Sequence, residues 1–181
     1  MFEAPDPSQS ALPLGSIQAI VLDTETTGLS TASDRIVQIG AVRLVAGKID
    51  HEDIFDRLIN PGMPIPPPST AIHGIDDRDV ADAEGFAEIM PAFATWAGRQ
   101  LVLGYAIGFD LALLQAAHRR TGLPWNPPRS LDIAHLVQLV APALPSTDLE
   151  AAAAWLGIEV RDRHRALGDA LITAEIFLAL R

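Results

Sequence analysis

The sequence contains no cysteine, and lysine is almost absent, since Lys48 is the only one among 13 cationic residues. The missing thiols exclude disulfides, thiolate catalysis and zinc bound through sulfur. Long apolar runs are also absent: none approaches the roughly 18 residues of a membrane span. The first residues lack the basic flank of a secretion signal. We therefore expect a cytoplasmic protein with no membrane partner.

The charge of the chain is one-sided, with 23 acidic residues against 13 basic ones and a net charge of −10. Tight binding to a long nucleic-acid duplex normally needs many cationic phosphate contacts, so this balance argues against it. A carboxylate metal site remains compatible with it, because such a site supplies part of the acidic excess. Hydrophobic residues make up 49% of the 181, which excludes wholesale disorder and suits one domain with one core.

The pattern of the chain predicts a mobile tail over residues 1–15, which are rich in proline and serine, and one domain over residues 16–181. A buried strand is predicted at 17–22, ending at Asp23, with two more strands joined by a Gly47-Lys48 hairpin turn. The remaining elements are predicted as follows: strands at 35–45, 49–59 and 100–105, a proline-rich loop at 61–68, a short capped helix at 69–74, helices at 84–99 and 110–120, a second proline-rich loop at 123–128, a strand that becomes a helix at 130–140, a helix at 148–156 capped by Ser146 or Thr147, and a long helix at 166–180.

Three strands in hairpin order, followed by strands that alternate with helices, predict an α/β fold with a mixed sheet flanked by helices. The first chemical signal lies on its first strand. Asp23 and Glu25 point to the same side of that strand, about 7 Å apart. Two adjacent carboxylates repel each other unless they are protonated or bridged by a cation, and hard oxygen ligands suit Mg²⁺ or Mn²⁺. The alternative is a polar turn in which Asp23 is only a cap.

Two further segments carry acidic residues at helix starts. Asp110 follows Gly108-Phe109, and taken alone it is an ordinary residue of a helix N-terminus. His164 and Asp169 are five residues apart, about 140° around a helix. They can converge only if His164 lies in the preceding loop while Asp169 is helical, and the charged segment before His164 favours a loop there.

Taken together, Asp-Thr-Glu-Thr-Thr-Gly at 23–28, Phe-Asp at 109–110 and His-Arg-Ala-Leu-Gly-Asp at 164–169 resemble the DEDDh 3′–5′ exonucleases. This is the DnaQ-like or RNase T-like group, which includes the proofreading subunit of DNA polymerase III. The resemblance covers residues 17–180 and keeps the order of the motifs. It implies a ribonuclease H-like fold with a mixed five-stranded sheet, in which the first three strands form antiparallel hairpins.

The resemblance also implies a mechanism with two divalent cations, Mg²⁺ or Mn²⁺. Asp23 is expected to bridge them, with Glu25 and Asp169 on the side of the attacking water and Asp110 on the side of the leaving oxygen. His164 is the expected general base, since a neutral imidazole can accept the proton of the water. The expected product is a 5′-mononucleotide released from the 3′ end of single-stranded DNA or RNA.

Substrate contacts are predicted at Thr24, Thr26, His73 and Tyr105. His73 belongs to a His-Gly-Ile segment that borders the bound nucleotide in the family, and amides of the turn at 24–28 can hold phosphate. Tyr105 either stacks on or hydrogen-bonds the nucleotide, or is a buried tyrosine at a strand end. The family often has His-Asn-Ala-x-Phe-Asp here, so Ala106 replaces an amide that members can place near the substrate.

Three arginines flank the expected base, namely Arg161, Arg163 and Arg165. They either meet the next phosphates of a single strand or form a solvated loop. The acidic charge favours short single-stranded ends, or a strand delivered by a polymerase or another larger assembly. Two other functions stay open: a catalytically weak nucleotide-binding or scaffold domain of the same fold, and a metal-dependent hydrolase of a non-nucleic phosphate ester.

Overall fold

The computed structural model describes residues 16–181, and the tail predicted at 1–15 lies outside the described residues. Five strands form one mixed sheet in the order β3-β2-β1-β4-β5, as the sequence pattern predicts. Neighbours among the first three strands are antiparallel, whereas β4 runs parallel to β1 and β5 runs parallel to β4. The strands are β1 (Ala19–Thr26), β2 (Ile36–Val45), β3 (Lys48–Leu58), β4 (Leu101–Gly104) and β5 (Ser130–Asp132).

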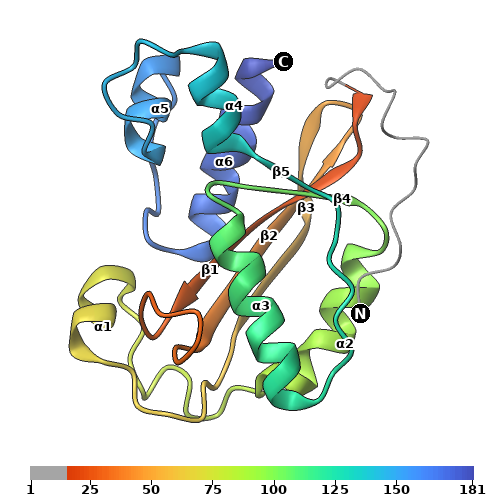
Figure 1. Ribbon diagram of the computed structural model, residues 1–181, viewed down its shortest axis with the longest axis vertical. Helices are drawn as coiled ribbons and strands as arrows, with labels where there is room; N and C mark the ends of the chain where they lie inside the picture. The colour runs from red at the N-terminus through yellow and green to blue at the C-terminus, as the bar shows by residue number, and fades with distance from the viewer. Residues whose placement is uncertain (1–15) are drawn as a thin grey trace.

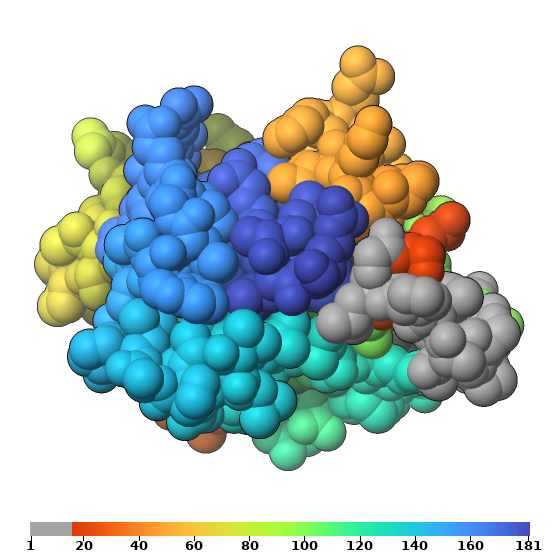
Figure 2. All heavy atoms as spheres, turned by 90° about the horizontal axis from the view of Figure 1, so that it is seen from above, coloured from red at the N-terminus to blue at the C-terminus, as the bar shows by residue number. Residues whose placement is uncertain are grey.

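Helices cover both faces of the sheet (Figure 1). On one face lie α2 (Phe86–Ala97) and α3 (Gly108–Thr121), and on the other lie α4 (Ile133–Val140), α5 (Leu149–Leu156) and α6 (Ala166–Leu180). Seen from above, α4, α5 and α6 pack side by side, and the β2–β3 hairpin stands beside α6 (Figure 2). Within the described residues, no helix is both long and apolar enough to cross a membrane.

Strand β1 divides its side chains between two cores. Ile20 and Leu22 pack with residues of α2 and α3, whereas Ala19 and Val21 pack with residues of α4, α5 and α6. All four are essentially inaccessible to solvent. Because the alternation continues to the end of the strand, its last residues are directed in turn toward the α3 face and the α6 face.

Gly40 on β2 allows α6 to approach the sheet closely. A Cβ atom at this position would lie 2.1 Å from the backbone nitrogen of Leu167 and 2.2 Å from the carbonyl carbon of Ala166, which no real Cβ tolerates. The neighbouring Gln38 is buried, and its Oε1 accepts a hydrogen bond of 3.2 Å from the Ala166 N–H. The first turn of α6 is therefore held against β2, opposite the middle of β1, where Asp23 pairs with Gly40.

The loop predicted at 61–68 is wrong at its end, because α1 (Pro67–His73) begins inside it. Two prolines occupy the first turn of this helix. The N–H groups of a first turn have no intrahelical acceptor, so proline, which has no N–H, loses no hydrogen bond there. The helix ends as predicted at a glycine, and Gly74 has a φ of 73°. β1 also continues past its predicted end at Asp23, since it pairs with β2 as far as Thr26.

The predicted cap of α5 is also wrong. Asp148 is the N-cap, and its carboxylate accepts a hydrogen bond of 2.7 Å from the Ala151 N–H. Ser146 does not cap the helix itself. Its hydroxyl donates a hydrogen bond of 2.6 Å to the other carboxylate oxygen of Asp148. Aspartate is as good a cap as serine, so residue type alone does not decide which of two neighbours takes the position.

Gly40→Ala should destabilise the protein and displace Asp169. The added methyl group has to push the backbone of α6 away from β2, and overpacking of this kind costs about 1–3 kcal/mol or more. We expect the thermal unfolding midpoint to fall by roughly 2–12 °C, at about 2–4 °C per kcal/mol for a chain of this size.

Gly108→Ala is the matched control. Gly108 lies at the start of α3, and a Cβ atom there would have nothing within 4 Å, so the same methyl group meets open space. Alanine also favours the helix, so the midpoint should be unchanged or higher. Equal midpoints for the two alanine variants would show that the close approach at Gly40 does not matter.

Candidate active site

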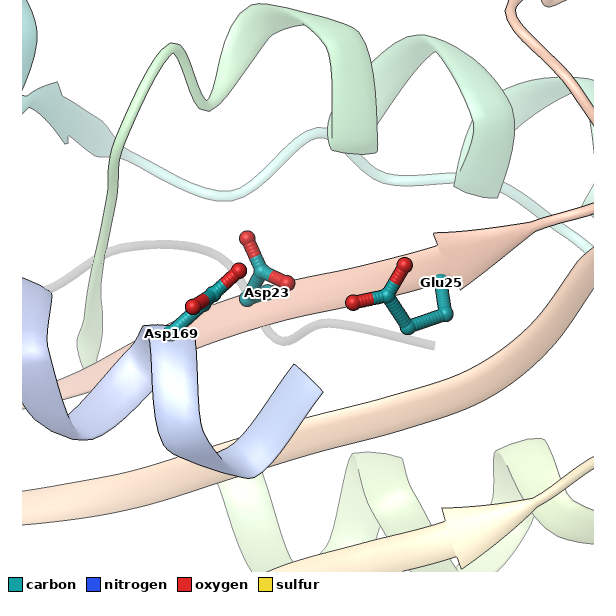
Figure 3. Close-up of side chains that lie close together, drawn as sticks. All are labelled: Asp23, Glu25 and Asp169. Atoms are coloured by element: carbon teal, nitrogen blue, oxygen red, sulfur yellow. The ribbon is translucent and has the colours of Figure 1, made fainter. Parts of the chain in front are cut away.

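Three carboxylates that are far apart in the sequence converge at the centre of the sheet. Asp23 and Glu25 come from β1 and Asp169 from the first turn of α6, and Figure 3 shows the three side chains facing one another. One oxygen atom of each lies within 4.8 Å of the others. Strand alternation directs the first two toward the α6 face, and the contact of α6 with β2 brings the third to them. The structure thus joins three of the four predicted metal ligands.

The fourth predicted ligand, Asp110, reaches the site from the opposite face of the sheet. It is 4% exposed, and its Oδ1 accepts a hydrogen bond of 2.6 Å from the Thr24 hydroxyl. The chain leaves β4 at Gly104 and begins α3 at Gly108, which sets Asp110 beside β1. Thr24, predicted as a substrate contact, therefore holds Asp110 with its side chain. Alternation along β1 is the sequence signal for this, because Thr24 points opposite to its two acidic neighbours.

Burial makes the charged state of all four carboxyl groups unfavourable. It raises the pKa of Asp23 well above its ordinary value, with further increases from the charges of Asp110, Asp169 and Glu25. Burial and the charge of Asp169 raise the pKa of Glu25 to about 7. Burial likewise raises the pKa of Asp110 to about 7, although the Thr24 hydrogen bond opposes this. Like charges gathered out of water require protons or a cation.

Asp169 supplies a separate indication of a cation. Its Oδ1 is buried, and within residues 16–181 it has no hydrogen-bond partner. A buried acceptor without a partner costs about 1–3 kcal/mol, and more when it is charged. Carboxylate oxygens are the ligands that Mg²⁺ and Mn²⁺ prefer. The donor set therefore fits a divalent cation.

Arg163 partly neutralises this cluster. Its guanidinium pairs with Asp169 on α6 and with Glu150 on α5. Burial raises the pKa of Asp169, and the positive charge of Arg163 opposes that rise. Arg161 instead pairs with Glu159 at the surface, while Arg165 is exposed and its charge lowers the pKa of Glu25. Of the three arginines predicted beside the base, two are thus engaged by carboxylates.

His164 lies in the turn before α6, whereas Asp169 lies within the helix. The two side chains can approach each other only in this arrangement, as expected from their spacing. The backbone at His164 has a φ of 60°, in the left-handed region where histidine is more frequent than most residues. Its Nδ1 is 3.3 Å from a guanidinium nitrogen of Arg163. Its charge lowers the pKa of Asp169, so the imidazole lies close to the carboxylate cluster.

His73 and Thr26 lie where α1 meets the end of β1. The His73 Nδ1 accepts a hydrogen bond of 3.0 Å from the Ile75 N–H, so in the neutral ring Nε2 carries the proton and donates to the Thr26 carbonyl at 3.2 Å. Burial lowers the pKa of His73, which favours this neutral form. The Thr26 hydroxyl donates to the Gly28 carbonyl at 2.7 Å. Both predicted substrate residues therefore fix the turn beside Glu25.

Tyr105 holds the start of α5. Its hydroxyl donates to the Thr147 carbonyl at 2.6 Å, and burial raises its pKa to about 12. The hydroxyl is thus used within the fold, as in the alternative of a strand-end tyrosine. The next residue, Ala106, has a φ of 52°. Asparagine tolerates that conformation better than alanine, so the departure from the family pattern leaves a strained backbone position.

The family model described as exonuclease, that of the RNase T family, matches residues 20–177. A DNA polymerase III subunit epsilon-like protein of Rhodobacter capsulatus is 42% identical over 171 residues, which are 93% of this chain and 24% of that protein. A PolC-type DNA polymerase III of Caldanaerobacter subterraneus is 33% identical over 161 residues, 89% of this chain and 11% of that one. The chain therefore spans a quarter or less of these relatives.

Solved structures share the fold. Exonuclease X, in complex with 5′ overhanging duplex DNA, is 26% identical with a TM-score of 0.74, and the match covers 90% of both chains. Exonuclease I of E. coli, in complex with a dT13 oligonucleotide, is 21% identical with a TM-score of 0.74 over 88% of this chain and 40% of that one. The sheet order and these likenesses confirm the predicted ribonuclease H-like fold. With a family model matched across nearly all of the described sheet and helices, this chain belongs to the RNase T family of exonucleases.

Proposed function

We propose that this protein is a metal-dependent 3′–5′ exonuclease that releases 5′-mononucleotides from the 3′ end of single-stranded DNA or RNA. The observation that carries the proposal is the convergence of Asp23, Glu25 and Asp169, with a buried Asp169 oxygen that lacks a partner within residues 16–181. The family supports nuclease chemistry for this cluster. The direction of digestion and the metal dependence are part of the proposal.

Two of the four carboxylates are held in position by neighbouring side chains of β1 and β2. Asp23, Glu25, Asp110 and Asp169 would hold two divalent cations, Mg²⁺ or Mn²⁺, which would supply an activated water at neutral pH and stabilise charge on the leaving oxygen. Thr24 keeps one Asp110 oxygen oriented by its hydrogen bond. Gln38 keeps the first turn of α6, and with it Asp169, against the sheet.

His164 is the proposed general base. It lies in the turn directly before α6, close to Asp169, and a neutral imidazole there accepts the proton of the attacking water. The contact of Arg163 with Nδ1 and with Asp169 has to loosen when the site is loaded, and Glu150 remains available to hold the guanidinium. Arg163 thus has a second carboxylate partner outside the cluster.

The proposed substrate is a short single-stranded 3′ end or a strand delivered by a partner. The net charge of −10 opposes unaided binding of long duplexes. Backbone amides of the turn at 24–28, together with Thr26, His73 and Tyr105, border the proposed position of the terminal nucleotide. Relatives named as DNA polymerase III proteins, in which the matching segment is a small part, support association with a polymerase or another large assembly.

The direct test is digestion of a single-stranded oligonucleotide in Mn²⁺ by the purified protein, on DNA and RNA side by side. We expect stepwise shortening from the 3′ end and release of 5′-mononucleotides, and loss of both with Asp23→Asn. A protein that binds the oligonucleotide but leaves it intact in Mg²⁺ and in Mn²⁺ would instead be the scaffold domain. Hydrolysis of only non-nucleic phosphate esters would also refute the proposal.

His164→Ala should lower turnover by roughly 10²–10⁴-fold, the usual contribution of a general base, while Mn²⁺ binding survives. His135→Ala, at a position 78% exposed on α4, removes an imidazole that lies outside the carboxylate cluster and should keep native turnover. Near-native turnover of His164→Ala from pH 6 to pH 9 would show that another group is the base.

The carboxyl groups should make the metal-free protein less stable as the pH rises. Glu25 and Asp110 have folded-state pKa values of about 7, above ordinary values of about 4, so the folded state binds more protons between these limits. Their contribution is greatest below about pH 4 and is lost as the pH passes 7. In EDTA, we therefore expect a lower thermal midpoint at pH 8 than at pH 6, and recovery at pH 8 when Mn²⁺ is added.

Asp23→Asn tests the cause. It removes the central negative charge at nearly constant shape, so in EDTA its midpoint at pH 8 should exceed that of the native protein, while added Mn²⁺ should give little stabilisation. Asp82→Asn, at an exposed residue outside the cluster, should behave like the native protein. If Mn²⁺ stabilised Asp23→Asn as strongly as the native protein, Asp23 would not be a metal ligand.

A further inference from the structure

A cavity lined by apolar and basic side chains lies at the far end of α3 from Asp110. Its volume is about 260 Å³, and it is lined by the start of β2, the segment at 59–62 that follows β3, the start of α2 and the end of α3. Ile36, Ile59 and Phe86 form apolar walls, and the charged groups in the lining are Arg35 and Arg120. None of the four carboxylates of the candidate active site lines it.

The two arginines of this cavity have no acidic partner among residues 16–181. A guanidinium nitrogen of Arg35 donates to the Ser33 carbonyl, and one of Arg120 donates to the Asp34 carbonyl at 3.2 Å, so both side chains are anchored to the same short stretch of backbone. Burial lowers the pKa of Arg120, and the charges of Arg35 and Arg119 lower it further. Two positive groups thus share a cavity in which the described part of the chain places no counterion, although the net charge of the chain is −10.

This pairing needs an explanation beyond helix stability. Basic residues in the last turn of α3 interact favourably with the helix dipole, which accounts for Arg119 and Arg120 equally. It does not account for Arg35, which precedes β2 and lines the same cavity. Guanidinium groups are well suited to bind phosphate oxygens in pairs of hydrogen bonds, and the partly apolar surroundings strengthen such contacts.

The cavity is connected to the candidate active site through the backbone. The Thr27 N–H donates to the Arg35 carbonyl at 2.8 Å, and the Arg35 N–H donates to the Thr27 hydroxyl at 3.0 Å, so Arg35 is tied to the turn that follows Thr26. Along α3, ten residues separate Asp110 from Arg120, about 15 Å at 1.5 Å per residue. A stacked strand advances about 3.4 Å per nucleotide, so this distance corresponds to about four or five nucleotides.

We propose that the cavity between Arg35 and Arg120 binds a phosphate group of the nucleic-acid strand, about four or five nucleotides from the 3′ end. The inference rests on the proposed function, because it takes the strand to end at the four carboxylates. The shared chemistry is a phosphate oxyanion, whose second source is free phosphate or the released mononucleotide. The site makes the protein favour strands that are long enough to reach it.

The test measures binding by fluorescence anisotropy, with labelled single strands of 3 and 12 nucleotides and the full chain carrying Asp23→Asn to prevent digestion. Adding Arg35→Gln and Arg120→Gln should weaken binding of the 12-mer roughly a hundredfold, about tenfold for each charge-assisted contact that is lost, and leave the 3-mer unchanged. The slope of log affinity against log salt should fall by about 0.7, the value for one lost phosphate contact on a single strand.

Arg119→Gln is the matched control. Arg119 is next to Arg120 in the sequence, but its side chain is exposed and does not line the cavity, so the variant removes the same charge outside the cavity. Equal weakening by Arg119→Gln and Arg120→Gln, or equal weakening of the 3-mer and the 12-mer, would overturn the proposal. Inorganic phosphate and a 5′-mononucleotide form a separate arm. If either small ligand binds, and this binding is lost when both arginines are replaced while binding of the 12-mer is unchanged, the cavity is a site for the free ligand and not for the strand.

The result can be separated from the test of catalysis. Anisotropy does not require turnover, so a native chain that shows length-dependent binding through the two arginines but digests no strand refutes the exonuclease and keeps the phosphate site. A chain that digests strands while the arginine variants bind the 12-mer normally keeps the exonuclease and refutes the phosphate site.

Discussion

The candidate active site depends on the contact between the first turn of α6 and the middle of β2. At Gly40 the two backbones meet where no Cβ atom would fit, and Gln38 adds a hydrogen bond to the same turn. This contact sets the distance between Asp169 and the two acidic residues of β1. Without it, the strand would carry two carboxylates on a sheet face with no third carboxylate beside them.

The same contact brings carboxyl groups together in a buried region, where their negative charges are unfavourable. Burial raises the pKa values of Asp23, Glu25, Asp110 and Asp169, and one Asp169 oxygen lacks a partner within residues 16–181. Arg163 offsets part of this charge from the turn before α6 and binds Glu150 on α5 at the same time. Strain of this kind is typical of sites that are arranged for a ligand rather than for stability.

Much of this arrangement could be predicted from short-range patterns. Alternation along one apolar strand places Asp23 and Glu25 on one side, and the charged segment before His164 indicates a turn that precedes a helix. What the pattern could not supply were the contacts between elements. The partner of Asp110 is Thr24 because α3 covers the opposite face of the sheet, and local sequence does not specify which face a helix takes. A glycine in β2 similarly indicates only a weak strand former until its neighbour is known.

The two layers of helices contribute different carboxylates to the candidate active site, and this has a consequence for folding. Asp110 arrives with the layer made by α2 and α3, whereas Asp169 arrives with the layer made by α4, α5 and α6. A chain in which only one layer had docked would hold an incomplete set of the proposed metal ligands. A half-assembled intermediate would then lack the complete carboxylate cluster, and the cluster would form only once both sides of the sheet are covered.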